Sequence, residues 1–407
     1  MSEKKKSKIL WMVPKWTLPA IDGARVATDS LIRNTIASGA EVDVLCLSAV
    51  SEKTDPQLMK ETWKVNNVFV IPRNIPDSGL AKKFFFLKQL ILKPFTPLTF
   101  SSFVGKKLEQ KIENLLTQGQ YDYVVLDGLH LGAPLFRNEL KIPSKTKIIY
   151  RAHNIEVDLW KRSVEEKKNP LLKMILYYQS LLVDRFEKKI ILNSDGIAAI
   201  SQEDFDVLKT IKSSPLELIP LGLGFQKALP PCQDGETKFL FIGRLDWAPN
   251  KDGLEWLLKE VWPTVVANRP NAVLKVVGSG NREWLKSYEG MKGLHVVGFV
   301  DSILDAYRDC HFTVVPIFYG SGTRIKVIES FAIARRLIST KMGVQGAGLD
   351  ESDYNRAESK EDWIKVLSEI KLDSAEQLQM EKSRTKVAAM FGEVEIGDKF
   401  YKWMQSL

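Results

Sequence analysis

Short apolar segments alternate with longer amphipathic segments along the first two hundred residues, and segment 24–38 is typical of the amphipathic ones. Continuous apolar runs of this length indicate strands buried on both faces of a parallel sheet, with crossover helices between them. The pattern predicts strands at 8–13, 41–47, 68–71, 121–127, 147–153 and 196–201. The first part of the chain is therefore predicted to be a doubly wound parallel sheet.

The alternation stops at segment 222–238, which is rich in glycine and proline, and then starts again. The second part is predicted to have helices at 253–266 and 325–335, and strands at 239–245, 274–280, 294–300, 312–317 and 335–340. We therefore expect an α/β protein of two Rossmann-like domains, at 1–220 and 221–380. The helical segment 381–407 is expected to pack back on the first domain. Because open parallel sheets bind ligands at the carboxyl ends of their strands, the two domains are expected to face a shared cleft.

The composition is that of a globular protein, with 44% hydrophobic and 27% charged residues in 407. The net charge of +8 indicates either an anionic partner or only a basic surface. Cys46, Cys232 and Cys310 are widely spaced and form no CxxC pair, which supports neither a disulfide framework nor a zinc site. No apolar run is long enough for a signal peptide or a spanning helix, so we expect a cytoplasmic protein.

Two loops after predicted strands of the second domain carry groups suited to phosphate. In "FIGRLDWAPNKDG", Arg244 and Lys251 follow Gly243 in a loop before a helix, and a guanidinium and an ammonium suit a diphosphate. In "VVGSGN", Gly278 and Gly280 stand where a backbone approaches another group closely. Each feature alone could be a simple turn or a solvated surface charge. Their recurrence at successive strand ends favours a nucleotide diphosphate ligand.

The third loop, "YGSGTRIKVIES", leads into a predicted helix whose N-terminal N–H groups and dipole attract an anion. Glu329 lies nearly two turns into this helix and could accept hydrogen bonds from a ribose. Alternatively, Glu329 is a helix carboxylate paired with Arg324 or Lys326. The candidate donor-binding residues of this loop are Gly320, Ser321, Gly322, Thr323 and Arg324.

In the first domain, candidate residues also follow predicted strands. "YRAHNIE" places His153 at a strand end, followed by Asn154 and Glu156, and "VVLDGLH" places Asp127 and His130 at another. His153 could instead be structural, and Asp127 could cap a helix. The acidic triplet 204–206 is expected to be the first turn of a helix capped by Ser201, so no metal site is predicted.

The ordered set of motifs resembles glycosyltransferase family 4, retaining enzymes of the GT-B fold. It comprises "LPAIDGARVAT", "RAHNIE", "FIGRLDWAPNKDG", "VVGSGN" and "GSGTRIKVIES", and it covers nearly the whole chain. The resemblance implies that Arg244 and Lys251 hold the donor diphosphate, that Glu329 binds the ribose and that His153 contacts the transferred sugar. It also implies that the loop with Asp22 and Gly23 lies on the acceptor side. We count Gly23 with the donor-binding residues and Asp22 with the acceptor-side candidates.

One position departs from the family pattern. The first glutamate of the family's Glu-x7-Glu motif would fall on Ser321, and in the family that glutamate helps to seat the donor sugar. A Gly-Ser-Gly-Thr-Arg loop resembles a subgroup of the family, so we interpret the change as specialisation. Loss of activity is the alternative.

The resemblance implies a nucleotide-sugar donor, no metal or other cofactor, and front-face attack assisted by the leaving phosphate. The acceptor is expected to be a sugar or a lipid-linked sugar in surface polysaccharide or glycolipid assembly. Segment 80–100, which mixes lysines with phenylalanines and leucines, could contact an anionic inner membrane face or could pack on its own domain. Segment 171–190 is expected to be a core or interdomain helix.

A nucleotide-sugar epimerase would need further acid/base carboxylates, for which Glu156 and Asp127 are candidates. A non-enzymatic anion or nucleic-acid binder is a third hypothesis, against which the phosphate-binding loops argue.

Overall fold

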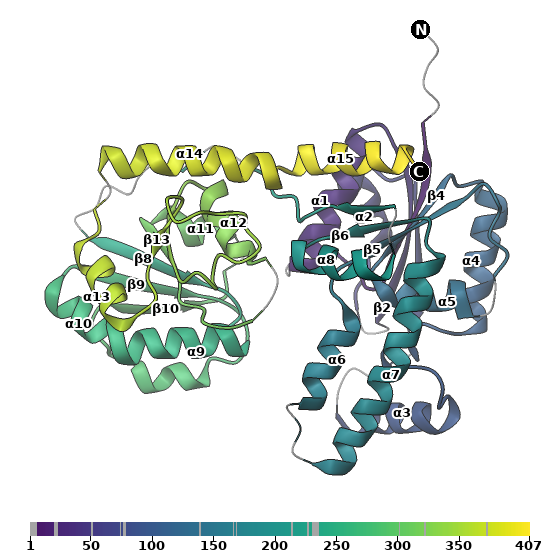
Figure 1. Ribbon diagram of the computed structural model, residues 1–407, viewed down its shortest axis with the longest axis horizontal. Coiled ribbons are helices and arrows are strands. Elements are labelled where there is room, and N and C mark those ends of the chain that lie inside the picture. Colours follow the sequence, from purple (N-terminus) through teal and green to yellow (C-terminus); the bar gives the residue numbers. More distant parts are fainter. Residues whose placement is uncertain are drawn as a thin grey trace, which may run out of the picture. The chain divides into compact units, whose positions relative to one another are not determined.

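The computed structural model describes residues 6–19, 23–49, 52–73, 75, 79–137, 140–165, 167, 169–212, 215–225, 228–229, 236–300, 302–320, 323–371 and 373–407. The chain forms two compact units. Unit 1 contains Met1–Gly222 together with Glu393–Leu407, and unit 2 contains Leu223–Gly392 (Figure 1). Each unit is described by itself.

Unit 1 is built on a seven-stranded sheet in the order β3-β2-β1-β4-β5-β6-β7, and all pairs are parallel. The chain runs outward from β1 to β3 and then crosses to the other side of β1 at β4, so the order reverses between β1 and β4. Ligands bind at such a reversal in open α/β sheets. The strands are β1 (Lys8–Val13), β2 (Glu41–Ala49), β3 (Asn67–Arg73), β4 (Tyr123–Asp127), β5 (Lys147–Ala152), β6 (Gly196–Ala199) and β7 (Leu216–Leu218).

Two helices of unit 1 begin with a side-chain cap followed by proline. Asp55 and Asn169 each accept a backbone N–H at a helix start, and proline follows each of them at the first helical position. The helices are α1 (Gly23–Ala37), α2 (Pro56–Trp63), α3 (Gly79–Leu92), α4 (Lys106–Gly119), α5 (Gly132–Arg137), α6 (Glu156–Glu165), α7 (Pro170–Asn193), α8 (Gln202–Ile211) and α15 (Glu393–Gln405), with short 3₁₀ turns at Leu98–Phe100 and Leu129–Leu131.

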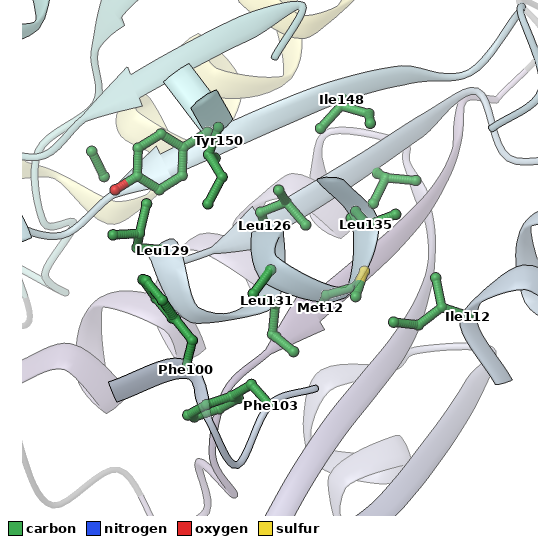
Figure 2. Close-up of a cluster of buried hydrophobic side chains, with 14 of the residues drawn as sticks. Met12, Phe100, Phe103, Ile112, Leu126, Leu129, Leu131, Leu135, Ile148 and Tyr150 are labelled. Atoms are coloured by element: carbon green, nitrogen blue, oxygen red, sulfur yellow. The ribbon is translucent and has the colours of Figure 1, made fainter. Parts of the chain in front are cut away.

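One face of the unit 1 sheet is covered by an apolar cluster, part of which is drawn in Figure 2. Met12, Leu126 and Tyr150 come from the three central strands, and Phe100 and Leu131 come from the segments that follow α3 and β4. All five side chains are almost fully buried. This core fixes the carboxyl ends of the central strands, where the candidate residues lie.

The other face is completed by the last helix of the chain. Ile396, Phe400 and Met404 of α15 are buried in the second apolar cluster of unit 1. A Cβ atom added at Gly397 would lie 2.3 Å from the Cβ of Asn34 in α1, so only glycine allows the two helices to approach this closely.

Unit 2 repeats the architecture with six parallel strands in the order β10-β9-β8-β11-β12-β13. The order reverses between β8 and β11. The strands are β8 (Thr237–Ile242), β9 (Ala272–Val277), β10 (Leu294–Gly298), β11 (Phe312–Val315), β12 (Arg336–Ser339) and β13 (Asn355–Arg356). The helices are α9 (Ala248–Trp256), a π-helical turn (Leu257–Val261), α10 (Trp262–Asn268), a 3₁₀ segment (Glu283–Tyr288), α11 (Ile303–Arg308), α12 (Ile325–Ala332), α13 (Lys360–Glu369) and α14 (Ser374–Phe391).

The predicted α/β fold of two parallel-sheet domains is confirmed, and every predicted strand is present. Three details differ from the prediction. The division near the carboxyl end falls after Gly392, because α14 belongs to unit 2 and only α15 belongs to unit 1. The helix expected at 253–266 starts earlier, at Ala248, because Pro249 stands in its first turn. The first half of α7 was expected in a core or between domains, but it exposes large apolar side chains.

Candidate functional site

Five of the predicted residues of unit 1 line one cavity of about 130 Å³ at the carboxyl ends of its central strands. Asp127 ends β4, His130 follows in the 3₁₀ turn, and His153 and Asn154 follow β5. Glu156 begins α6. The structure therefore brings these five residues together at the reversal of strand order, as parallel-sheet geometry predicts.

Asp127 is the centre of a buried network. Its Oδ1 accepts hydrogen bonds from Arg151 Nη1 at 2.9 Å and from His153 Nε2, and its Oδ2 accepts one from Trp11 Nε1 at 3.0 Å. Burial alone would raise the pKa of Asp127, but the Arg151 guanidinium and the His153 ring hold this pKa well below its ordinary value. The carboxylate is therefore ionised and fixes His153, whereas the alternative of a helix cap finds no support in these contacts.

The orientation of His153 follows from that network. Because Nε2 donates to the ionised carboxylate, Nδ1 is the ring nitrogen left to contact a ligand. A hydroxyl can form a hydrogen bond with a ring nitrogen in this position. This arrangement suits contact with a sugar, and it rests on a carboxylate that Arg151 holds in place.

His130 has a different environment. Its Nε2 lies 2.9 Å from Thr99 Oγ1, and its ring packs against Phe100 and Phe103. Burial, the charge of Arg73 and the charge of His153 together lower the pKa of His130 to about 4. His130 is thus a neutral hydrogen-bonding group at physiological pH.

The start of α6 is occupied by a carboxylate from the protein itself. Glu187 of α7 accepts the backbone N–H groups of Glu156 at 2.9 Å and Val157 at 3.0 Å. Burial raises the pKa of Glu187 to about 7, and burial also raises the pKa of Glu156. Because Glu187 uses these two N–H groups, this helix start is already matched to an anion within the fold.

In unit 2, Arg244 and Lys251 flank the turn after β8. Arg244 Nε and Nη2 each lie 3.0 Å from an Asp246 carboxylate oxygen, and the Arg244 side chain is 68% exposed. Lys251 was expected in the loop before a helix, but it lies in the first turn of α9, with Nζ 6.0 Å from the centre of the Trp284 ring. Both cations therefore stand at the reversal of strand order in unit 2.

Two of the predicted glycines are explained by contacts within unit 2. A Cβ added at Gly278 would lie 1.8 Å from the carbonyl oxygen of Gly243, and one at Gly280 would lie 2.4 Å from Asp246 Oδ1. Gly280 also has a φ of +95°, which favours glycine. The loops after β8 and β9 therefore need glycine in order to pack on each other, and a donor contact at either glycine stays a prediction.

Lys326 is a residue that sequence reasoning considered only as an ion-pair partner of Glu329. Its Nζ donates to Asn250 Oδ1 at 2.7 Å and lies 4.8 Å from the centre of the Phe241 ring. Asn250 Nδ2 in turn donates to the carbonyl of Arg244 at 2.9 Å. The one signal in the sequence that could have singled it out is its place between apolar residues at the start of α12. The contacts place this ammonium directly behind the Arg244 turn.

Glu329 is partly buried in α12 of unit 2. Burial raises the pKa of Glu329, opposed by the charge of Lys326 and a hydrogen bond with Tyr307. Burial and the charge of Arg324 lower the pKa of Lys326, opposed by Glu329. Each of the two groups thus limits the cost of burying the other.

The remaining predicted residues lie around the starts of α1 and α12. Gly23 begins α1, Arg324 is buried at the start of α12, and Thr323 Oγ1 donates to the carbonyl of Gly346 at 3.1 Å. The φ of Gly320 is +115°. Asp22, Ser321 and Gly322 lie outside the described residues.

The acidic triplet 204–206 lies in α8, where Ser201 accepts the Asp204 N–H at 3.1 Å, so the predicted capped helix is confirmed. In the described part of the chain, His, Cys, Asp and Glu side chains form no group of three or more suited to a metal ion. No helix there has both the length and the apolarity to cross a bilayer.

Residues 236–362 match the protein family described as Glycosyl transferases group 1. This segment runs from the start of β8 into α13 and includes Arg244, Lys251 and Glu329. The match lies within unit 2.

A curated relative from Klebsiella pneumoniae, described as an uncharacterized 44.6 kDa protein in the cps region, is 25% identical over 365 residues. The match covers 85% of this chain and 86% of the relative.

Solved structures similar to nearly the whole chain show the fold. Sucrose-phosphate synthase from Thermosynechococcus elongatus superposes with a TM-score of 0.68 at 16% identity, covering 98% of this chain and 99% of that one. Anabaena HepE in complex with UDP-glucose superposes with a TM-score of 0.63 at 14% identity, covering 98% and 100%. The predicted GT-B fold is confirmed, and the comparisons support a glycosyltransferase.

Proposed function

We propose that the protein is a retaining glycosyltransferase that moves a hexose-type sugar from a nucleotide diphosphate to an acceptor in surface polysaccharide or glycolipid assembly. The observation that carries the proposal is the match of residues 236–362 to Glycosyl transferases group 1, a segment that contains Arg244 and Lys251. HepE was solved with UDP-glucose, and the Klebsiella relative is described by its cps region. The first supports a nucleotide-sugar donor, and the second supports a role in polysaccharide assembly.

Unit 2 is assigned the donor. Arg244 can exchange its exposed pairing with Asp246 for two oxygens of a diphosphate, because a guanidinium binds such oxygens in the same forked geometry. Lys251 adds a second charge, and Glu329 is assigned the ribose. The loop 320–324 is assigned the phosphate and the sugar, and Ser321 replaces the glutamate that would otherwise seat the sugar.

The reaction breaks the bond between the sugar C1 and the diphosphate oxygen. A new bond forms between C1 and the acceptor oxygen on the same face, and the acceptor proton moves to the departing phosphate. Arg244 and Lys251 stabilise the negative charge that develops on the diphosphate, so the proposal requires no divalent cation. We assign to His153 the contact with the transferred sugar, held by ionised Asp127.

Unit 1 is assigned the acceptor, a sugar or lipid-linked sugar. The acceptor-side candidates are Asp127, His130, Asn154 and Glu156 around the cavity, together with Asp22. We place the protein in the cytoplasm and peripherally at the inner membrane face, with no nucleic-acid partner. An ionised Asp127 is a poor general acid, which makes the epimerase alternative less favourable.

The test is calorimetric titration of the full chain with UDP, GDP, ADP and CMP and their common sugar conjugates, with magnesium and with a chelator. We expect one diphosphate to bind equally in both conditions. Lys251→Met should weaken that binding about tenfold or more, because it removes a charge from the diphosphate. Lys259→Met, at an exposed lysine of the π-helical turn in the same unit, is the matched control and should bind normally.

Two results would refute the assignment of the donor: no binding of any nucleotide, or equal binding by Lys251→Met and wild type. For the best donor, the anomeric configuration of the transferred sugar is then read by NMR. Inversion would refute the retaining mechanism alone.

A further inference from the structure

The helix α3 exposes its apolar stripe to solvent. Leu80, Phe84, Leu87 and Ile91 follow one another at helical spacing and are 54% to 82% exposed. No described side chain of α3 is buried. An amphipathic surface helix normally turns its apolar stripe toward its own core, and large exposed apolar patches mark interaction sites. The stripe of α3 is therefore a candidate contact surface.

The first half of α7 shows the same feature. Leu171, Met174, Tyr178 and Leu181 also follow helical spacing and are 38% to 63% exposed. The second half of α7 is anchored in the core of unit 1 through Val183, Ile190 and Ile191. The helix therefore extends from a buried half to an exposed apolar half.

The two stripes belong to one end of unit 1. Tyr178 Oη donates to the carbonyl of Pro94 at 3.0 Å, and the Leu98 N–H donates to Gln179 Oε1 at 2.7 Å. The segment that follows α3 is thus fastened to the middle of α7, and Phe95 within it is 78% exposed. Figure 1 shows α3 beside the lower part of α7. We call these exposed apolar residues the α3–α7 surface, which consists of Leu80, Phe84, Leu87, Ile91, Phe95, Leu171, Met174, Tyr178 and Leu181.

The charge of these segments has one sign. Residues 79–95 and 170–183 contain five lysines and no aspartate or glutamate: Lys82, Lys83, Lys88, Lys93 and Lys173. The centres of protein interfaces are depleted of lysine, whereas leucine, phenylalanine and lysine together are typical of helices that lie in a bilayer interface. Each lysine near an anionic bilayer contributes roughly a fivefold factor to binding.

We propose that the α3–α7 surface docks on an anionic lipid bilayer, with its apolar side chains in the interface and its lysines on the headgroups. The proposal depends on the exposed side chains and their charge, and it does not depend on glycosyl transfer. Two helices joined through Pro94 and Leu98 provide a broad contact with the bilayer.

The test is co-sedimentation of the full chain with phosphatidylcholine vesicles and with vesicles that also contain phosphatidylglycerol. We expect binding to the anionic vesicles that falls as salt is added. Phe84→Glu with Ile91→Glu, and separately Met174→Glu with Leu181→Glu, should each reduce binding about tenfold or more. Lys83→Glu with Lys88→Glu should also reduce it, because these exposed lysines then repel the headgroups.

The matched control is Leu378→Glu with Val394→Glu, two apolar residues outside this surface that are 60% and 62% exposed. This control should bind vesicles like the wild type, and melting temperatures verify that all variants are folded. Equal binding to neutral vesicles, or a loss in the control as large as in the α3 variant, would overturn the proposal. A dimer detected by light scattering that Phe84→Glu with Ile91→Glu abolishes would overturn it in favour of a second copy of the chain. Donor binding should be unchanged in every variant, which separates this test from that of the proposed function.

Discussion

Replacing Asp127 with asparagine tests whether the buried network carries the stability of unit 1. The change preserves shape but removes the charge that faces Arg151, a residue with no exposed surface. Apart from this carboxylate, the guanidinium donates to neutral oxygens, the Ala27 carbonyl at 3.2 Å and Thr28 Oγ1 at 3.5 Å. The variant therefore leaves a buried cation without its anion.

The expected cost follows from that isolation. Removing one partner of a buried ion pair typically lowers the free energy of unfolding by about 3 to 5 kcal/mol. Because the folded pKa of Asp127 is lowered, its contribution is present above the ordinary carboxyl pKa and is lost as the pH falls through the folded value. The variant should lack this dependence on acid pH.

Hydrogen exchange measured by mass spectrometry at increasing denaturant reads each unit separately. Peptides that contain β4 and β5 should lose protection in Asp127→Asn, whereas peptides that contain β9 of unit 2 should not change. Arg151→Met removes the cation, and the double variant completes a cycle. The double variant should lose less than the sum of the single losses, by about 2 kcal/mol or more.

A loss of protection below about 1 kcal/mol in β4 and β5 would contradict this reasoning. Additive effects in the cycle would also contradict it, because they would show that the carboxylate and the guanidinium act independently.

Three further predictions follow from unit 1 and unit 2. Because burial raises the folded pKa of Glu187 from 4.5 to about 7, its contribution to stability is lost as the pH rises between these two values. Glu187→Gln should therefore flatten the decline in unit 1 stability between about pH 4.5 and pH 7, as measured by hydrogen exchange. Gly278→Ala should destabilise unit 2 by about 1 to 3 kcal/mol or more in denaturant melts, because the added Cβ would lie 1.8 Å from the carbonyl oxygen of Gly243. Gly105→Ala is the control, because a Cβ added there would have no atom within 4 Å. Lys326→Met should weaken donor binding about tenfold and should also lower the stability of unit 2, because Glu329 loses the charge that opposes its burial and Asn250 Oδ1 loses its donor. Calorimetry compared with exposed Lys365→Met would contradict this prediction if the two variants bind the donor alike.

The strands were predictable because buried parallel strands are continuous apolar runs. The exceptions are β7 and β13, edge strands of three and two residues, which are too short to carry a periodic pattern. Helix starts were also predictable where a polar cap was present, as at Ser201. The exposure of α7 could not be predicted. Its large apolar residues are typical of a core helix, and only the structure shows that the second half is buried and the first half is exposed.

The candidate cavity was predictable in its members but not in its electrostatics. Asp127 and His153 were predicted to lie together because both stand at strand ends. Their partner Arg151 lies within β5, and nothing in the sequence indicated that it would form an ion pair with Asp127. The register pairs Asp127 directly with Arg151 across β4 and β5, and this pairing creates the network. The sequence pattern does not contain register between neighbouring strands. For the same reason, it did not reveal that Gly278 packs on Gly243.

Because α15 belongs to unit 1, the two units cannot be completed in the order of the sequence during translation. A ribosome releases the chain from its amino end, so all of unit 2 emerges before the residues that complete unit 1. Until Phe400 and Met404 arrive, the face of the sheet that they cover stays open. Unit 2 can reach its native state first, and unit 1 keeps apolar surface exposed until residues Glu393–Leu407 have been synthesised. A premature stop codon before Glu393 would therefore damage the part of the protein that was made first.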